Sequence, residues 1–213
     1  QPGRHRRFNR YVRVPWDLSR VDTLGLYGGI ESWGVEVGGH TRFPVHRFYS
    51  RTQTAAGGDP LRIAIAVNPE YRIEIWTPEG HLERVVLREN ARLAPTQEEL
   101  SWAGDNLSGF ALLDEGLVNR VRAEVPVPDT LPAIVALVMG KSGDLWARRT
   151  FMWEPEGDAT WDVFSRRGQL LGVATLPGRF VLHEIGQDYL LGVRYDEFNV
   201  PYVEMYELRR RER

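Results

Sequence analysis

Residues 73–85, I-E-I-W-T-P-E-G-H-L-E-R-V, contain the pattern that decides the fold. The same pattern returns in residues 161–173, W-D-V-F-S-R-R-G-Q-L-L-G-V. In each copy the second residue is acidic and the fourth is aromatic. Thr or Ser follows, then a turn that contains Gly, and then a second apolar run. Alternation with a period of two predicts half-buried strands, and the short turn predicts that the two strands of each copy form a hairpin.

The remaining strand candidates group around these two hairpins. Residues 61–87 are predicted as three consecutive strands, residues 145–176 supply a second meander, and residues 180–208 supply a third. The last strand of the third meander, residues 203–206 with the sequence V-E-M-Y, repeats the apolar-acid-apolar-aromatic core of the opening pattern. Four short antiparallel strands recurring about every 42–44 residues are typical of the blades of a β-propeller.

We therefore expect an all-β fold, a partial β-propeller of three to four blades built from four-stranded antiparallel meanders. The expected organisation is a basic N-terminal arm over residues 1–10 and a single propeller-like domain over residues 11–213, with blades near residues 11–49 (partial), 50–90, 128–177 and 178–210. The last blade has three visible strands, so its fourth is expected from residues 11–14 or 21–27.

A helical insertion is expected over residues 91–120, where the β pattern stops. Thr96 and Glu99 have the spacing of a capping box, in which a hydroxyl residue and an acid three positions later satisfy the first amides of a helix. Gly104 and Gly109 argue against one long helix, so one or two short helices are expected to cover the end of a sheet, with a functional lid as the alternative.

Residues 61–210 resemble the C-terminal half of the six-bladed, NHL-type β-propeller proteins of bacteria. The resemblance rests on residues 71–82 (Y-R-I-E-I-W-T-P-E-G-H-L), 128–132 (P-D-T-L-P), 143–146 (G-D-L-W), 161–172 (W-D-V-F-S-R-R-G-Q-L-L-G) and 184–197 (E-I-G-Q-D-Y-L-L-G-V-R-Y-D-E). It implies propeller architecture and export, and it brings no catalytic motif. Six blades of about 40 residues need roughly 240 residues, so this chain can hold only part of a ring.

The composition narrows the classes of function. The chain has 213 residues and a formal net charge of −2, which gives no electrostatic case for binding nucleic acid. It has no cysteine, which excludes disulfides, thiolate metal sites and thiol catalysis. No apolar run is long enough to span a membrane as a helix. We expect a periplasmic or otherwise exported protein whose signal peptide was removed before Gln1, a trimmed chain being the alternative.

Searches for catalytic and metal-binding patterns return nothing. The five histidines are dispersed, without the i, i+4 spacing of a helical metal site, and no G-x-S-x-G is present. Residues 140–142, G-K-S, lack the preceding glycine of a phosphate loop and are predicted as a turn. We therefore expect no catalytic residue, no metal and no cofactor.

An open arc of blades leaves an apolar flank bare, which favours an interaction role. The candidate interface residues are the loop tryptophans and the arginines of the arm: Trp33, Trp102, Trp153, Arg4, Arg6 and Arg7. The arm is either a solvated terminus or a tether to an acidic partner or an anionic membrane surface.

The expected function is that of a non-catalytic, extrinsic accessory subunit that docks to a larger protein assembly, such as a membrane-bound, energy-converting complex. One alternative is a propeller that binds a small ligand or hydrolyses it. A second alternative is a homodimer in which two half-propellers complete one ring.

Overall fold

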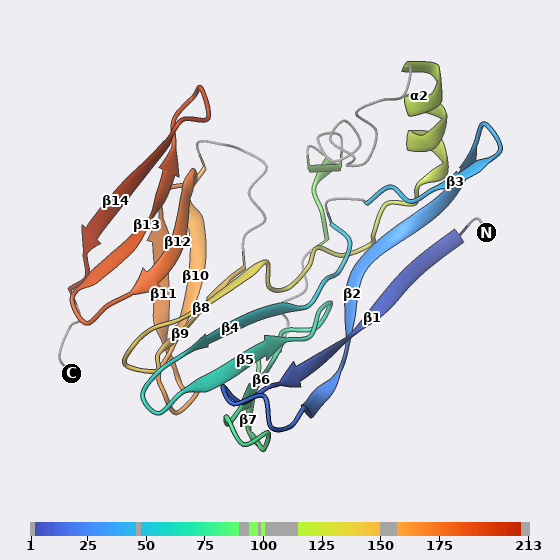
Figure 1. Cartoon of the computed structure of the whole chain (residues 1–213). Helices are drawn as coiled ribbons and strands as arrows, with labels where there is room; N and C mark the ends of the chain where they lie inside the picture. The colour runs from blue at the N-terminus through green and yellow to red at the C-terminus, as the bar shows by residue number, and fades with distance from the viewer. Residues whose placement is uncertain are drawn as a thin grey trace.

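The computed structural model describes residues 3–45, 48–89, 94–97, 99–100, 115–149 and 157–209. These residues form an all-β fold of four antiparallel sheets (Figure 1). The first sheet contains β1 (Gly3–Arg13), β2 (Asp22–Val37) and β3 (His40–Arg42), and the second contains β4 (Gln53–Gly57), β5 (Arg62–Ala66), β6 (Arg72–Trp76) and β7 (Leu82–Leu87). The third contains β8 (Ala136–Met139), β9 (Leu145–Arg148), β10 (Ala159–Phe164) and β11 (Leu170–Leu176), and the fourth contains β12 (Phe180–Ile185), β13 (Tyr189–Tyr195) and β14 (Pro201–Glu207).

Each of the last three sheets is a meander with its strands in chain order, as the sequence predicts. The first strands of these sheets are neighbours, because β8 lies against both β4 and β12. The hairpins of the opening pattern are confirmed as β6–β7 and β10–β11. Strands β11, β12 and β13 lie within the predicted meanders over residues 145–176 and 180–208.

One five-residue turn explains why the pattern needs its glycine. In residues 77–81 the Thr77 amide donates to the His81 carbonyl (2.9 Å) and the Gly80 amide donates to the Thr77 carbonyl (3.0 Å). Residues 165–169 make the same two bonds at 2.8 Å each. The fourth residue of each turn is a glycine in the left-handed conformation, with φ +87° at Gly80 and +77° at Gly168. This conformation costs glycine little because glycine has no Cβ atom. In residues 196–200, which form the same turn, Asn199 takes this place at φ +60°.

The third sheet is the centre of the core because both of its faces are buried. Alternation along β9 sends Leu145 and Ala147 to one face and Trp146 to the other. The first face packs on Ile73 and Ile75 of β6. The second packs on the fourth sheet through residues that include Phe180, Leu182, Ile185 and Leu190. The second, third and fourth sheets are therefore layers stacked face to face in chain order.

A buried acid joins the second and third sheets. Asp162 of β10 is fully buried and accepts hydrogen bonds from the Tyr71 hydroxyl (2.8 Å) and from Arg88 Nη1 (2.6 Å). Arg149 Nε forms an ion pair at 3.1 Å with Oδ2, the oxygen that also accepts the bond from Tyr71. The pKa of Tyr71 is raised above its ordinary value, first by burial and then by its bond to the Asp162 carboxylate. Two hydrogen-bond donors beside the second sheet and one ion-pair partner beside the third thus hold one carboxylate.

The first sheet is held to the second in the same way. Glu74 of β6 stands where Asp162 stands in β10, and it accepts a hydrogen bond from the Tyr27 hydroxyl of β2 (2.6 Å). Burial, followed by this bond, raises the pKa of Tyr27. The Thr52 hydroxyl adds a bond to the Gly28 carbonyl (2.7 Å). The hairpin of β1 and β2 is therefore the layer that precedes the second sheet.

The N-terminal residues differ most from the expectations. Residues 3–10 are not a separate arm, because they form most of β1 and pair with β2 along its length. Strand β2 continues through Gly28 and Gly29. A Cβ atom on Gly28 would lie within 2.4 Å of the Arg6 side chain, so the glycine leaves room for that arginine.

The N-terminal strands also do not supply a fourth strand for the last sheet. Residues 11–14 and 21–27 were the expected sources, but β1 and β2 pair with each other. They lie on the opposite side of the molecule from β14 (Figure 1). Among the described residues, β14 pairs with β13 alone.

The helical insertion is described in part. The Thr96–Glu99 capping box is present: the Thr96 amide donates to Glu99 Oε2 (2.7 Å), and the Glu99 amide donates to Thr96 Oγ1 (3.2 Å). Helix α2 (Glu115–Glu124) follows and ends four residues beyond the predicted insertion. The rest of residues 91–120 lies outside the described residues. Across the described part of the chain, no helix has the length and apolarity needed to cross a membrane.

Candidate interaction surfaces

The hairpin of β1 and β2 presents an apolar outer face. Tyr27 and Leu24 turn toward the second sheet and are buried. Leu26 and Ile30, on the other face of the same strand, are exposed, and so is Phe8, which pairs with Gly28 across the ladder. The connection between the strands adds further exposed apolar side chains, namely Val14, Trp16, Leu18 and Val21. Within the described part of the chain, nothing covers this end of the stack of sheets.

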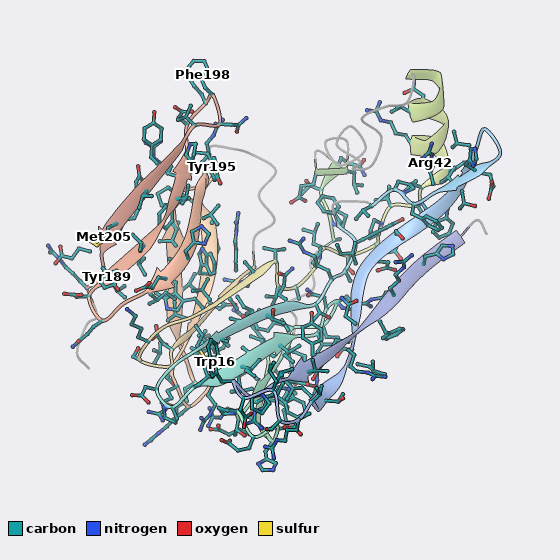
Figure 2. The ribbon with its side chains drawn as sticks, in the orientation of Figure 1. Trp16, Arg42, Tyr189, Tyr195, Phe198 and Met205 are labelled. Atoms are coloured by element: carbon teal, nitrogen blue, oxygen red, sulfur yellow. The ribbon has the colours of Figure 1, made fainter. Side chains whose placement is uncertain are left out.

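The fourth sheet forms the opposite end, and none of the described residues covers its outer face. The cross-strand register aligns Val181, Val193 and Val203 in one row and Leu191 and Met205 in the next. Val203 is 78% exposed and Met205 is 69% exposed. Met205 projects away from the other sheets (Figure 2). We call these five residues the β14 flank.

The inner face of β14 is polar and well ordered by contacts. Glu204 accepts a hydrogen bond from the Tyr206 hydroxyl (2.7 Å) and one from Arg194 Nε (2.6 Å). These two bonds lower the pKa of Glu204, the tyrosine bond being the larger cause. The Tyr206 ring packs edge-on against Phe180 at 5.0 Å between centroids. Glu204 thus occupies the same position in the third strand of the fourth sheet as Glu74 and Asp162 occupy in the third strands of theirs. Unlike those two acids, Glu204 is bonded only to side chains of its own sheet among the contacts described.

A hollow of about 310 Å³ lies beside the first sheet. Arg4 and Trp33 line it, together with the buried Glu31, which forms an ion pair with Arg4. The Tyr49 hydroxyl donates to the Pro126 carbonyl (3.1 Å), which joins the two walls. Burial and then the Glu31 charge raise the pKa of Tyr49 to about 12. The lining can hold a flat apolar group and offer it hydrogen bonds.

The structure brings together part of the predicted interface set. Arg4 and Trp33 share the hollow. Arg6 points toward the second sheet, with Nη2 3.4 Å from the Asn68 carbonyl, whereas Arg7 is exposed. Trp102 and Trp153 lie outside the described residues. The sequence prediction missed the β14 flank, although Val203 and Met205 alternate in a strand that already lacked a visible neighbour.

Among the described residues, no three or more His, Asp or Glu side chains are grouped so that they could hold a metal ion. No family model matches the chain, and the searches of curated proteins and of solved structures returned no match. The resemblance to NHL-type propellers therefore stays a prediction from the sequence.

Proposed function

We propose that this protein is a non-catalytic interaction protein, an open arc of propeller-like blades that binds partners through its two end sheets. It acts as an extrinsic accessory subunit of a larger assembly on the exported side of a membrane, such as an energy-converting complex. Contacts with the partner take the place of the neighbouring blades that cover each end sheet in a complete propeller.

The arrangement of the sheets supports the arc. Meanders stacked face to face, with their first strands adjacent, are the packing that propeller blades use. An acid in the third strand recurs as Glu74, Asp162 and Glu204. A tyrosine of the preceding layer reaches this acid in two of the three cases, which are Tyr27 and Tyr71. The acid thus recurs in three sheets, and its bond to a tyrosine of the preceding layer recurs in two of them.

The observation that carries the proposal is the pair of apolar ends. A closed ring covers both faces of every blade, whereas here Phe8 and Leu26 at one end and Val203 and Met205 at the other are exposed. Exposed apolar patches of this kind mark interaction sites in soluble proteins. Docking at a membrane-bound assembly rests on the export that the family resemblance implies and on the exposed Arg7 and Arg10 of β1, which suit an anionic surface.

Co-purification tests the proposal. Tagged wild type and the end-face variants Leu26→Glu and Met205→Glu are used to capture partners from an extract of the native organism. The control is Leu171→Glu, which places the same charge on an exposed leucine of β11. A partner recovered with wild type and the control, but lost with either end-face variant, supports the proposal. A partner recovered equally with all four proteins, or no partner at all, refutes it.

The hollow at Arg4 and Trp33 favours a second candidate, a propeller that binds a small ligand. Its volume of about 310 Å³ falls at the lower end of the range for ligand pockets. A thermal-shift screen of aromatic carboxylates should then raise the melting temperature of wild type and leave that of Trp33→Ala unchanged. If no compound shifts the wild type, this candidate is wrong.

A further inference from the structure

We infer that β14 pairs antiparallel with β14 of a second copy of this chain, so that two fourth sheets join into one continuous sheet. The inference rests on the proposed function, because it names the partner of one of the two apolar ends. It differs from the completion of a ring by two half-propellers, since the copies meet edge to edge along a strand. The argument depends on the main chain, the sequence and the outer face of β14.

The main-chain groups at the free edge of β14 can be assigned from the ladder. Residue pairs in an antiparallel ladder alternate between hydrogen-bonded and non-hydrogen-bonded. The Leu208 amide donates to the Asp188 carbonyl (2.7 Å), in line with the register that pairs Tyr189 with Glu207. The inward groups are therefore those of Tyr206 and every second residue before it. The amides and carbonyls of Val203 and Met205 point to the open edge.

The sequence of the edge strand is self-complementary. Residues 202–206, Y-V-E-M-Y, have the same chemical order in both directions about Glu204. A two-fold axis at Glu204 places Val203 opposite Met205 of the second copy and Tyr202 opposite Tyr206. In this register the outward amides and carbonyls of Val203 and Met205 exchange hydrogen bonds with their counterparts. A self-complementary patch is what a two-fold homodimer requires, which is why a second copy fits this edge better than an unrelated strand.

The same register also brings apolar side chains of the two copies together on the outer face of the sheet. The row of Val181, Val193 and Val203 continues into Met205 and Leu191 of the second copy. Val203 and Met205, the two most exposed apolar side chains of β14, then lie beside apolar neighbours. Within residues 202–206 the outer face of β14 carries no charge, and Glu207, which lies on the same face, falls opposite Pro201 of the second copy, beyond the apolar centre of the pairing.

The two Glu204 carboxylates would face each other across the axis, and like charges opposite each other destabilise a pair of strands. Arg194 and Tyr206 compensate this, because each Glu204 already accepts a bond from both. One strand pair buries less than the roughly 1,200 Å² of a stable interface. We therefore expect a dimer that dissociates on dilution.

Sedimentation velocity over a concentration series is the first test. Wild type should change from 24.4 kDa at low concentration toward twice that mass at high concentration. Val203→Lys and Met205→Lys should stay monomeric with an unchanged near-ultraviolet circular dichroism spectrum, because a charged side chain blocks edge pairing. The control, Val173→Lys, changes an exposed valine of β11 and should dimerise like wild type. Wild type that stays monomeric, or lysine variants that dimerise as well as wild type, would overturn the inference.

Disulfide cross-linking tests the register. The chain has no cysteine, so a single substitution reports one contact. Across the axis, Glu204 forms a non-hydrogen-bonded pair with Cα atoms about 4.5 Å apart, which a disulfide can bridge. Glu204→Cys should form a covalent dimer under mild oxidation, and Val173→Cys should not. Equal cross-linking of both variants would show random collision and refute the register.

The two proposals fail separately. If the chain is monomeric at all concentrations but Met205→Glu loses a partner from the extract, the second copy is the wrong occupant and the interaction role stands. If the chain is monomeric and the end-face variants also lose nothing, both proposals are wrong.

Discussion

Substitution of Asp162 by Asn tests how the sheets are held together. The change keeps the shape of the side chain and removes the charge that Arg88 and Arg149 share. Breaking a buried ion pair by removing one partner costs about 3–5 kcal/mol. The two arginine side chains are 32% and 30% exposed, so water compensates them in part. We expect a loss of about 3 kcal/mol in the free energy of unfolding, which corresponds to a fall of roughly 6–12 °C in Tm for a chain of this size.

The equivalent acids provide matched controls. The side-chain exposure rises from 0% for Asp162 to 13% for Glu74 and 25% for Glu204. Because water screens exposed ion pairs, Glu74→Gln should cost about 1–2 kcal/mol and Glu204→Gln less than about 1 kcal/mol. Urea denaturation followed by tryptophan fluorescence measures all three variants. A loss below about 1 kcal/mol for Asp162→Asn, or equal losses in all three, would refute the idea that this acid locks the second sheet to the third.

Two further properties follow from the same contacts. The raised pKa values of Tyr27 and Tyr71 mean that the folded state favours the protonated tyrosines. Their contribution to the free energy of unfolding is therefore complete below the ordinary pKa of 10 and is lost as the pH rises above it. The urea midpoint of the wild type should therefore fall between pH 9 and pH 11. The midpoint of Tyr71→Phe should fall by less, because one of the two tyrosines is gone. Equal falls in wild type and variant would contradict this role of Tyr71. Gly168→Ala should cost about 1–2 kcal/mol in urea denaturation, because Gly168 has φ +77° and a Cβ atom there would meet the Arg84 side chain at 2.8 Å. Asn199→Gly, at the equivalent place of another turn, should change stability by only a few tenths of a kcal/mol, and equal costs for both would argue against the shared turn.

Much of the fold was predictable because local signals agree with the tertiary structure. Residues 170–195 contain three mainly apolar runs separated by short turns with a glycine, and β11, β12 and β13 occupy these runs. The turn at Gly168 was predictable because its left-handed conformation depends on one residue. These elements needed no information from distant parts of the chain.

The elements that were missed depend on partners far away in the sequence. Strand β1 is rich in arginine and has no apolar period, and it is ordered by pairing with β2. Strand β4, Q-T-A-A-G, has weak strand formers and is held between β5 and β8. In the apolar run of residues 131–139, strand β8 begins at Ala136, because the main chain at Ile134 bonds to the Asn68 side chain instead.

The candidate surfaces were predictable only in part. Arg4 and Trp33 were singled out by residue type, and both line the hollow. Val203 and Met205 look like ordinary strand residues in the sequence. Their exposure arises because no described element packs over the fourth sheet, which is a property of the assembled stack.

Hydrogen–deuterium exchange of β14 tests the central claim most directly, that the fourth sheet is an unfinished blade whose open edge binds. At low protein concentration the outward amides of Val203 and Met205 should exchange fast, whereas the inward amide of Glu204 should be protected. At high concentration the two outward amides should become protected, while the exchange of residues 170–176 in β11 stays the same. Outward amides that are protected at every concentration, or that exchange fast at every concentration, would contradict the account.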